Sequence, residues 1–67
     1  MITEIGIAAG DIWHYLDQRG KATLDEMAKY IKKPKELLLM SLGWLAREGH
    51  ISLGGPETGY LATLTRR

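Results

Sequence analysis

A proline at position 34 divides the middle of the chain into two helices joined by a short turn. Proline cannot continue a helix because it lacks the backbone N–H, but it suits the first turn of a new one. We therefore expect residues 32–34 to form a tight turn and a helix to run from about Pro34 to Glu48, with Gly49 as its C-terminal stop. Two helices joined by so short a turn make a helix-turn-helix unit.

The helix before this turn is predicted to be short and amphipathic. Thr23 and Glu26 have the spacing of a capping box, in which each side chain bonds the backbone N–H of the other residue. Apolar side chains then occur at i, i+3, i+4 and i+7, namely Leu24, Met27, Ala28 and Ile31. This spacing is typical of a helix with one buried face.

A longer helix is expected at the start of the chain, from the N-cap candidate Thr3 to Arg19 and Gly20. Gly6 and Gly10 inside it each cost about 1 kcal/mol relative to alanine. Either another backbone passes close to them or the helix is weak there, and we expect close packing. The apolar residues that recur at three- and four-residue spacing are Ile5, Ala8, Ala9, Ile12 and Leu16.

The rest of the chain predicts a small sheet. Lys21-Ala22 is long enough only for a strand stub, and residues 50–53 and 60–65 alternate apolar and polar side chains. Residues 54–59 between them are rich in glycine and fit a turn, so we expect a β-hairpin. The predicted fold class is mainly α with a small β-hairpin (α+β): three helices plus a two- to three-stranded sheet, in a single domain over residues 1–67.

The length, the lack of cysteine and the net charge limit what the chain can do. Its 67 residues include no cysteine, and Met1 is not followed by a basic apolar leader, so we expect a cytoplasmic protein without disulfides or a membrane span. A net charge of +1 leaves any attraction to nucleic acid to a local patch. A core this small seldom suffices alone, which favours association with a partner chain.

The element order and one run of residues resemble winged helix-turn-helix proteins. The resemblance implies DNA binding, with the helix after Pro34 in the major groove and the hairpin, or wing, on the DNA backbone. Together with Ile5-Gly6 and Ala8-Ala9-Gly10, the run is more narrowly similar to a family of short, free-standing prokaryotic winged-helix proteins of uncharacterised function. The run is Leu42-Gly43-Trp44-Leu45-Ala46-Arg47-Glu48-Gly49-His50-Ile51.

The helix after Pro34 is apolar on more than its core side. At about 100° per residue, its core stripe is Leu38, Ser41, Leu42 and Leu45. A helix that is apolar all round belongs inside something, so we predict an interface for a second copy or for another protein. The alternative is that Trp44 and Met40 pack onto the wing or onto Trp13. The predicted interface residues are Leu37, Leu39, Met40, Gly43 and Trp44.

DNA binding is the second hypothesis, and it competes for the same helix. Base readout needs hydrogen-bonding groups, which the outward side of this helix largely lacks. Glu57 in the wing loop would repel phosphates. The candidate nucleic-acid contacts are Lys29, Lys32, Lys33, Lys35, Arg47, Arg66 and Arg67.

Catalysis, a metal and a cofactor are not expected. Asp11, His14 and Asp17 are three residues apart, but steps of three drift around a helix, so a solvated face is the better interpretation. His50 stands alone, and the glycines of residues 54–59 lie between strands instead of before a helix, where a phosphate loop would place them. The sequence therefore predicts a non-enzymatic homodimeric module, with a small DNA-binding regulator as the alternative.

Overall fold

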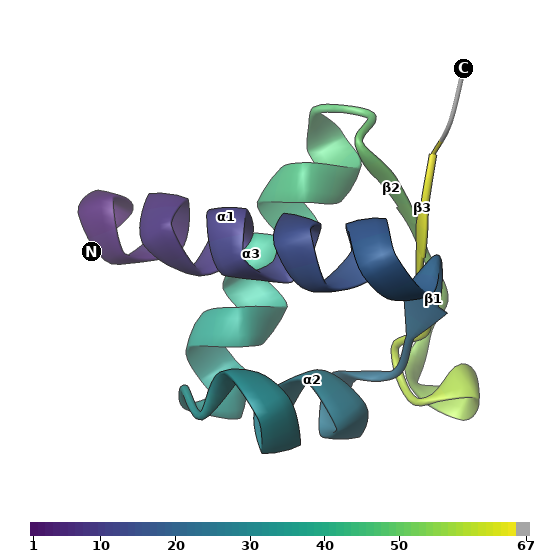
Figure 1. The fold of residues 1–67 in the computed structure, drawn as a ribbon. Coiled ribbons are helices and arrows are strands. Elements are labelled where there is room, and N and C mark those ends of the chain that lie inside the picture. Colours follow the sequence, from purple (N-terminus) through teal and green to yellow (C-terminus); the bar gives the residue numbers. More distant parts are fainter. Residues whose placement is uncertain (66–67) are drawn as a thin grey trace.

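Three α-helices and a three-stranded sheet are formed by residues 1–65, which are the residues that this computed structural model describes (Figure 1). The helices are α1 (Ile2–Arg19), α2 (Leu24–Ile31) and α3 (Lys35–Arg47). The strands are β1 (Lys21–Ala22), β2 (Ile51–Leu53) and β3 (Ala62–Leu64), and a 3-10 helix, η1 (Pro56–Thr58), lies in the loop between the last two. The predicted fold class is confirmed, with the two-residue stub as the third strand of the sheet.

The sheet closes the end of the helical layer at which α1 finishes (Figure 1). Its central strand is β3, which pairs antiparallel with both β1 and β2. Ile51 stands opposite Leu64, and Ala22 opposite Ala62. These four side chains are buried, so the sheet turns an apolar face toward the helices.

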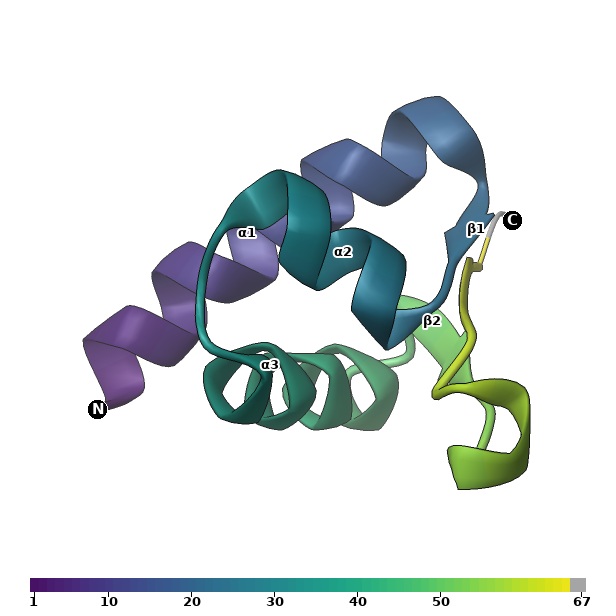
Figure 2. The ribbon, with the colours of Figure 1, turned by 90° about the horizontal axis from the view of Figure 1, so that it is seen from below.

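The core lies where α1 crosses α3, with α2 packed beside both helices (Figures 1 and 2). The predicted core stripe of α3 is confirmed, because all four of its residues are buried. The apolar stripes of α1 and α2 also face the core as their spacing predicted, except that Ile5 is only partly buried and lies outside the core cluster. The largest fully buried side chains are Ile12, Leu16, Met27, Leu38, Leu42 and Ser41.

The start of α1 differs from the prediction. The helix begins at Ile2 with Met1 as its N-cap, and no side chain caps it. The N–H of Ile5 already bonds the carbonyl of Met1 at 3.0 Å, so Thr3 lies inside the first turn and the N-cap prediction was wrong. At the other end Gly20 adopts a φ of 84° and ends the helix as expected.

The turn between α2 and α3 follows the prediction to within one residue. Lys32 takes a left-handed φ of 61°, and Pro34 is the N-cap of α3 instead of its first residue. The helix ends at Arg47, and Gly49 follows with a φ of 81°. No helix within residues 1–65 is long and apolar enough to cross a membrane.

The expected close packing at Gly6 and Gly10 is not found within the chain. A Cβ atom added at either position would meet nothing within 4 Å. Both glycines are exposed, because they lie on a flank of α1 that no other element covers in residues 1–65. No contact among residues 1–65 therefore explains these two glycines.

Candidate functional site

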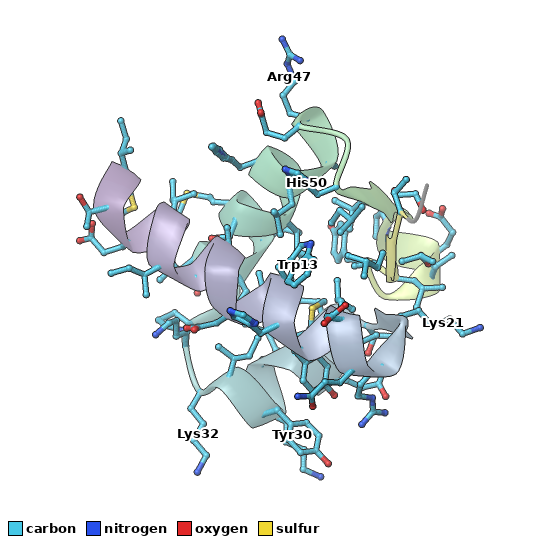
Figure 3. All side chains as sticks on the ribbon, turned by 45° about the horizontal axis from the view of Figure 1, so that its top comes forward. Trp13, Lys21, Tyr30, Lys32, Arg47 and His50 are labelled. Carbon is cyan, nitrogen blue, oxygen red and sulfur yellow. The ribbon has the colours of Figure 1, made fainter. Side chains whose placement is uncertain are left out.

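The outward side of α3 carries two large apolar side chains that remain partly in solvent. Met40 is 44 % exposed and Trp44 is 42 % exposed. Gly43 and Arg47 are also exposed, and Arg47 points away from the body of the molecule (Figure 3). Leu37 and Leu39 instead pack partly buried against the core. Of the predicted interface residues, Met40, Gly43 and Trp44 therefore form the accessible part.

Met40 and Trp44 border an apolar groove with the N-terminal half of α1. The groove has a volume of about 290 Å³ and is lined by Ile2, Ile5, Gly6, Met40 and Trp44. Ile2 is 86 % exposed. Met40 and Trp44 thus border the groove together with residues of α1. Because both side chains stay partly exposed, the alternative in which packing onto the wing or Trp13 covers them is not found.

A buried serine holds the two walls of the groove together. The Ser41 hydroxyl donates to the carbonyl of Leu37 at 2.8 Å and also lies 3.3 Å from the carbonyl of Ile5. A hydroxyl is small enough to let the backbone of α1 approach α3 at this point. The groove therefore lies beside this contact between α1 and α3.

The lysines at the helix-helix turn are divided between solvent and ion pairs. Lys33 Nζ lies 3.5 Å from Asp11 Oδ2, and Lys35 Nζ lies 2.7 Å from Asp25 Oδ1. These pairs place carboxylates beside two of the four lysines near the turn that were predicted to contact nucleic acid. Lys29 and Lys32 are exposed.

Two of the predicted nucleic-acid contacts, one at the helix-helix turn and one at the end of α3, lie far apart. Lys32 and Arg47 lie at opposite ends of the molecule (Figure 3). Arg66 and Arg67 lie outside the described residues. Lys32 and Arg47 therefore do not combine into one basic surface.

The wing loop is folded back against the start of α2. The N–H of Leu24 donates to the carbonyl of Gly59 at 3.0 Å, and the Thr58 hydroxyl donates to the carbonyl of Gly55 at 2.8 Å. Tyr60 has a φ of 55°, which interrupts the extended backbone, so β3 begins at Ala62 and the strand predicted from residue 60 is shorter. The loop is thus a compact turn that exposes Glu57.

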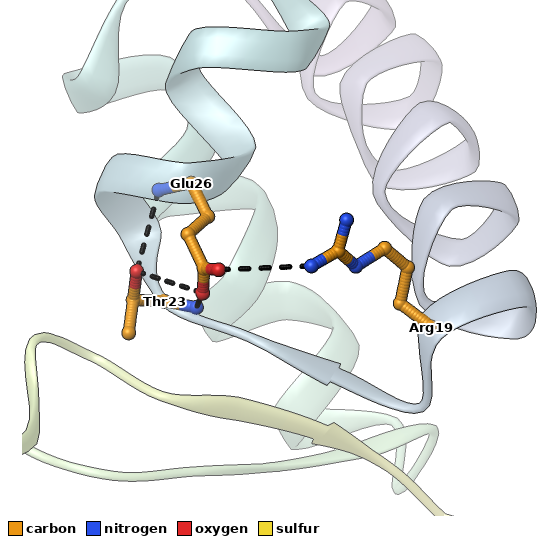
Figure 4. Close-up of polar contacts among 3 residues, drawn as sticks. All are labelled: Arg19, Thr23 and Glu26. Atoms are coloured by element: carbon orange, nitrogen blue, oxygen red, sulfur yellow. Dashed lines mark hydrogen bonds and ion pairs between the residues drawn. The ribbon is translucent and has the colours of Figure 1, made fainter.

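The N-terminus of α2 is fixed by the predicted capping box (Figure 4). The N–H of Thr23 donates to Glu26 Oε1 at 2.8 Å, and the N–H of Glu26 donates to Thr23 Oγ1 at 3.3 Å. The hydrogen bond from the Thr23 N–H, followed by the one from the Thr23 hydroxyl, lowers the pKa of Glu26 below its ordinary value. This box holds one end of the helix-turn-helix unit in a defined conformation.

Arg19 makes contacts within its own chain that the sequence pattern did not predict. Its guanidinium lies 3.8 Å from Glu26 Oε2 (Figure 4). It also lies 5.3 Å and 5.9 Å from the ring centres of Tyr15 and Tyr30. The two tyrosine rings are 5.4 Å apart. These contacts link the C-terminal end of α1 to α2 and pair the positive charge of Arg19 with a carboxylate.

Within residues 1–65, no three His, Asp or Glu side chains come together as a metal site. Of the three spaced residues on α1, Asp11 pairs with Lys33, and the ring of His14 meets the ring of Trp13 edge-on at 5.8 Å. The groove between α1 and α3 therefore remains the most distinctive surface of the described chain.

Comparison with protein families identifies the family of this chain. The model of a family described as a winged helix-turn-helix domain (DUF2582) matches residues 1–62, which is nearly the whole chain. The chain belongs to this family. No curated protein and no solved structure gives a match. The predicted winged helix-turn-helix resemblance is thus confirmed, and α2, α3 and the hairpin of β2 and β3 are the parts that give the domain its description.

Proposed function

We propose that this winged helix-turn-helix domain works as a homodimeric module through protein contacts, with a second copy covering the face formed by α1 and α3. The observation that carries the proposal is the apolar groove between these helices, bordered by Ile2, Met40 and Trp44. Exposed apolar surface gathered in one place marks interaction sites, whereas single exposed residues are ordinary.

The exposed apolar side chains form the centre of an interface that must extend beyond them. At about 200 Å² for a fully exposed large side chain, the exposed parts of Ile2, Met40 and Trp44 come to about 340 Å² of a total surface of 4461 Å². Specific interfaces bury about 800 Å² per partner, so the rest of such an interface must come from side chains around the groove.

The scarcity of hydrogen-bonding side chains on this face favours protein over DNA as its partner. A DNA-reading helix presents hydrogen-bonding side chains, whereas the outward side of α3 presents Met40, Gly43 and Trp44. A dimer formed through this face also removes α3 from the major groove.

The proposal is tested by Trp44→Lys, with Ile7→Lys as a matched control. Ile7 is 57 % exposed on α1 and does not line the groove. We expect Trp44→Lys to lower the molar mass measured by light scattering to that of the monomer, and Ile7→Lys to leave it unchanged. Circular dichroism identifies any variant that fails to fold. A folded Trp44→Lys variant with the wild-type mass would refute the proposal.

DNA binding is the second candidate, supported by the family description and by the exposed Lys29 and Lys32 beside the helix-turn-helix turn. Its test is a salt titration of duplex DNA affinity for the wild type and for Lys29→Glu with Lys32→Glu. Under this candidate the double variant loses the affinity and the slope against log salt falls by about two. Equal, weak binding by both proteins would reject it.

A further inference from the structure

The outward side of α2 carries an aromatic ring that lies largely in solvent. Tyr30 is 62 % exposed, and Figure 3 shows Tyr30 and Lys32 projecting from α2 on the same side of the molecule. A tyrosine ring offers a flat apolar face on which a second planar group stacks. All residues that line the groove belong to α1 and α3, so this side of α2 is a separate surface.

Other side chains of the chain hold this ring in place. The ring centres of Tyr15 and Tyr30 are 5.4 Å apart, and the Arg19 guanidinium lies 5.9 Å from the centre of the Tyr30 ring. Arg19 is itself paired with Glu26, one turn before Tyr30 in α2. A side chain that is already ordered loses less conformational entropy when a ligand binds it. Tyr30 is therefore a pre-organised platform that remains mostly open.

Two lysines beside this ring have no carboxylate partner within residues 1–65. Lys29 comes directly before Tyr30 and Lys32 comes two residues after it, and both lysines are exposed. The other two lysines near the turn each pair with a carboxylate. The backbone of Lys32 is fixed, because its N–H donates to the carbonyl of Ala28 at 3.1 Å. Both ammonium groups are thus available to an anion at the C-terminal end of α2.

We propose that the surface formed by Lys29, Tyr30 and Lys32 binds single-stranded nucleic acid. An unpaired base stacks on the Tyr30 ring, and phosphates on either side of that base meet the two lysines. Charge complementarity selects a polyanion, and the open ring selects an exposed base, because every base has a planar face. The inference does not depend on the homodimer, because this surface and the groove share no residue.

A DNA duplex fits this surface less well than a single strand. The faces of its bases are covered by their own stacking, so a duplex offers the surface phosphates but no base to stack on the ring. An acidic peptide would likewise pair with the lysines alone. Tyr30 therefore distinguishes the single strand from these two partners.

The ring is tested by Tyr30→Leu, with Tyr30→Phe as the matched control that keeps an aromatic face. The dissociation constant of a fluorescein-labelled oligothymidylate of about 12 nucleotides is measured by fluorescence anisotropy over a salt series. We expect Tyr30→Leu to raise it about tenfold at every salt concentration, because one stacked base is lost. We expect Tyr30→Phe to change it less than threefold. Circular dichroism and Tm show whether each variant folds.

The lysines are tested by Lys29→Gln with Lys32→Gln, and Lys21→Gln is the control. Lys21 is exposed on β1, away from Tyr30 (Figure 3). We expect the double variant to reduce the slope of log affinity against log salt by about 1.4, because each contact to a single strand contributes ~0.7. We expect Lys21→Gln to leave the slope unchanged. Both replaced lysines are exposed and unpaired, so this test does not depend on the folding of Tyr30→Leu.

Three results would overturn the proposal. They are equal affinities for Tyr30→Leu and Tyr30→Phe, tighter binding of a duplex of the same length or of polyglutamate than of the single strand, and no binding by the wild type at the lowest salt concentration. None of these results affects the homodimer, which is tested by the solution mass.

Discussion

Replacing Ile2 by alanine is expected to weaken the dimer strongly while leaving the single chain intact. Ile2 is 86 % exposed, so it contributes little to the folded monomer, and alanine is the better helix former. The substitution removes three carbons at about 0.8 kcal/mol each, or ~2 kcal/mol per copy after scaling by the exposed fraction. Two copies lose ~4 kcal/mol, which corresponds to a rise of about a thousandfold in the dissociation constant.

Ile7→Ala is the matched control for this substitution. It removes the same three carbons from a side chain that is 57 % exposed, but on a part of α1 that does not line the groove. Light scattering over a dilution series measures both dissociation constants, and urea unfolding checks both folds. Equal dissociation constants for the two variants would refute the reasoning, because the position of the isoleucine would then not matter.

Three further substitutions test the fold that presents this face. Thr23→Ala removes one half of the capping box at α2 and should cost about 1 kcal/mol in urea unfolding; a loss below 0.3 kcal/mol, on the order of experimental error, would argue against the box. The lowered pKa of Glu26 in the folded state means that its ionised form stabilises the protein above its ordinary pKa of ~4.3. This contribution is lost as pH falls through the lowered value, so the Tm difference between wild type and Glu26→Ala should vanish in acid, and a difference that persisted there would contradict this account. Leu42→Ala, at a fully buried position, should cost about 2–5 kcal/mol, and a smaller loss would mean that the core is loosely packed there.

Local patterns were sufficient to predict the helices and the core side of α3. The capping box at Thr23 and Glu26 depends on residues three apart, and helical periodicity places Leu38 and Leu42 on one face. Such features are determined by neighbours in the sequence. For the same reason the strand stub and the hairpin were predictable in kind, while the ends of β3 depended on the backbone conformation of Tyr60.

The groove could not be predicted from the same patterns, because it lies between two helices that are far apart in the sequence. Ile2 and Gly6 reach Trp44 only through the way that α1 crosses α3. Gly6 and Gly10 were the sequence feature that marked this part of α1 as unusual for a helix, although they did not indicate a groove. The pairing of Lys33 with Asp11 likewise depends on tertiary contact, and it changes how the turn lysines are interpreted.

We propose that a second copy covers the face formed by α1 and α3. The solution mass of the unmodified protein tests this most directly. Light scattering across a concentration series should give twice the chain mass of 7.5 kDa at micromolar concentration, with dissociation only on dilution. A mass of one chain at every concentration would contradict the account and leave the groove to a different protein.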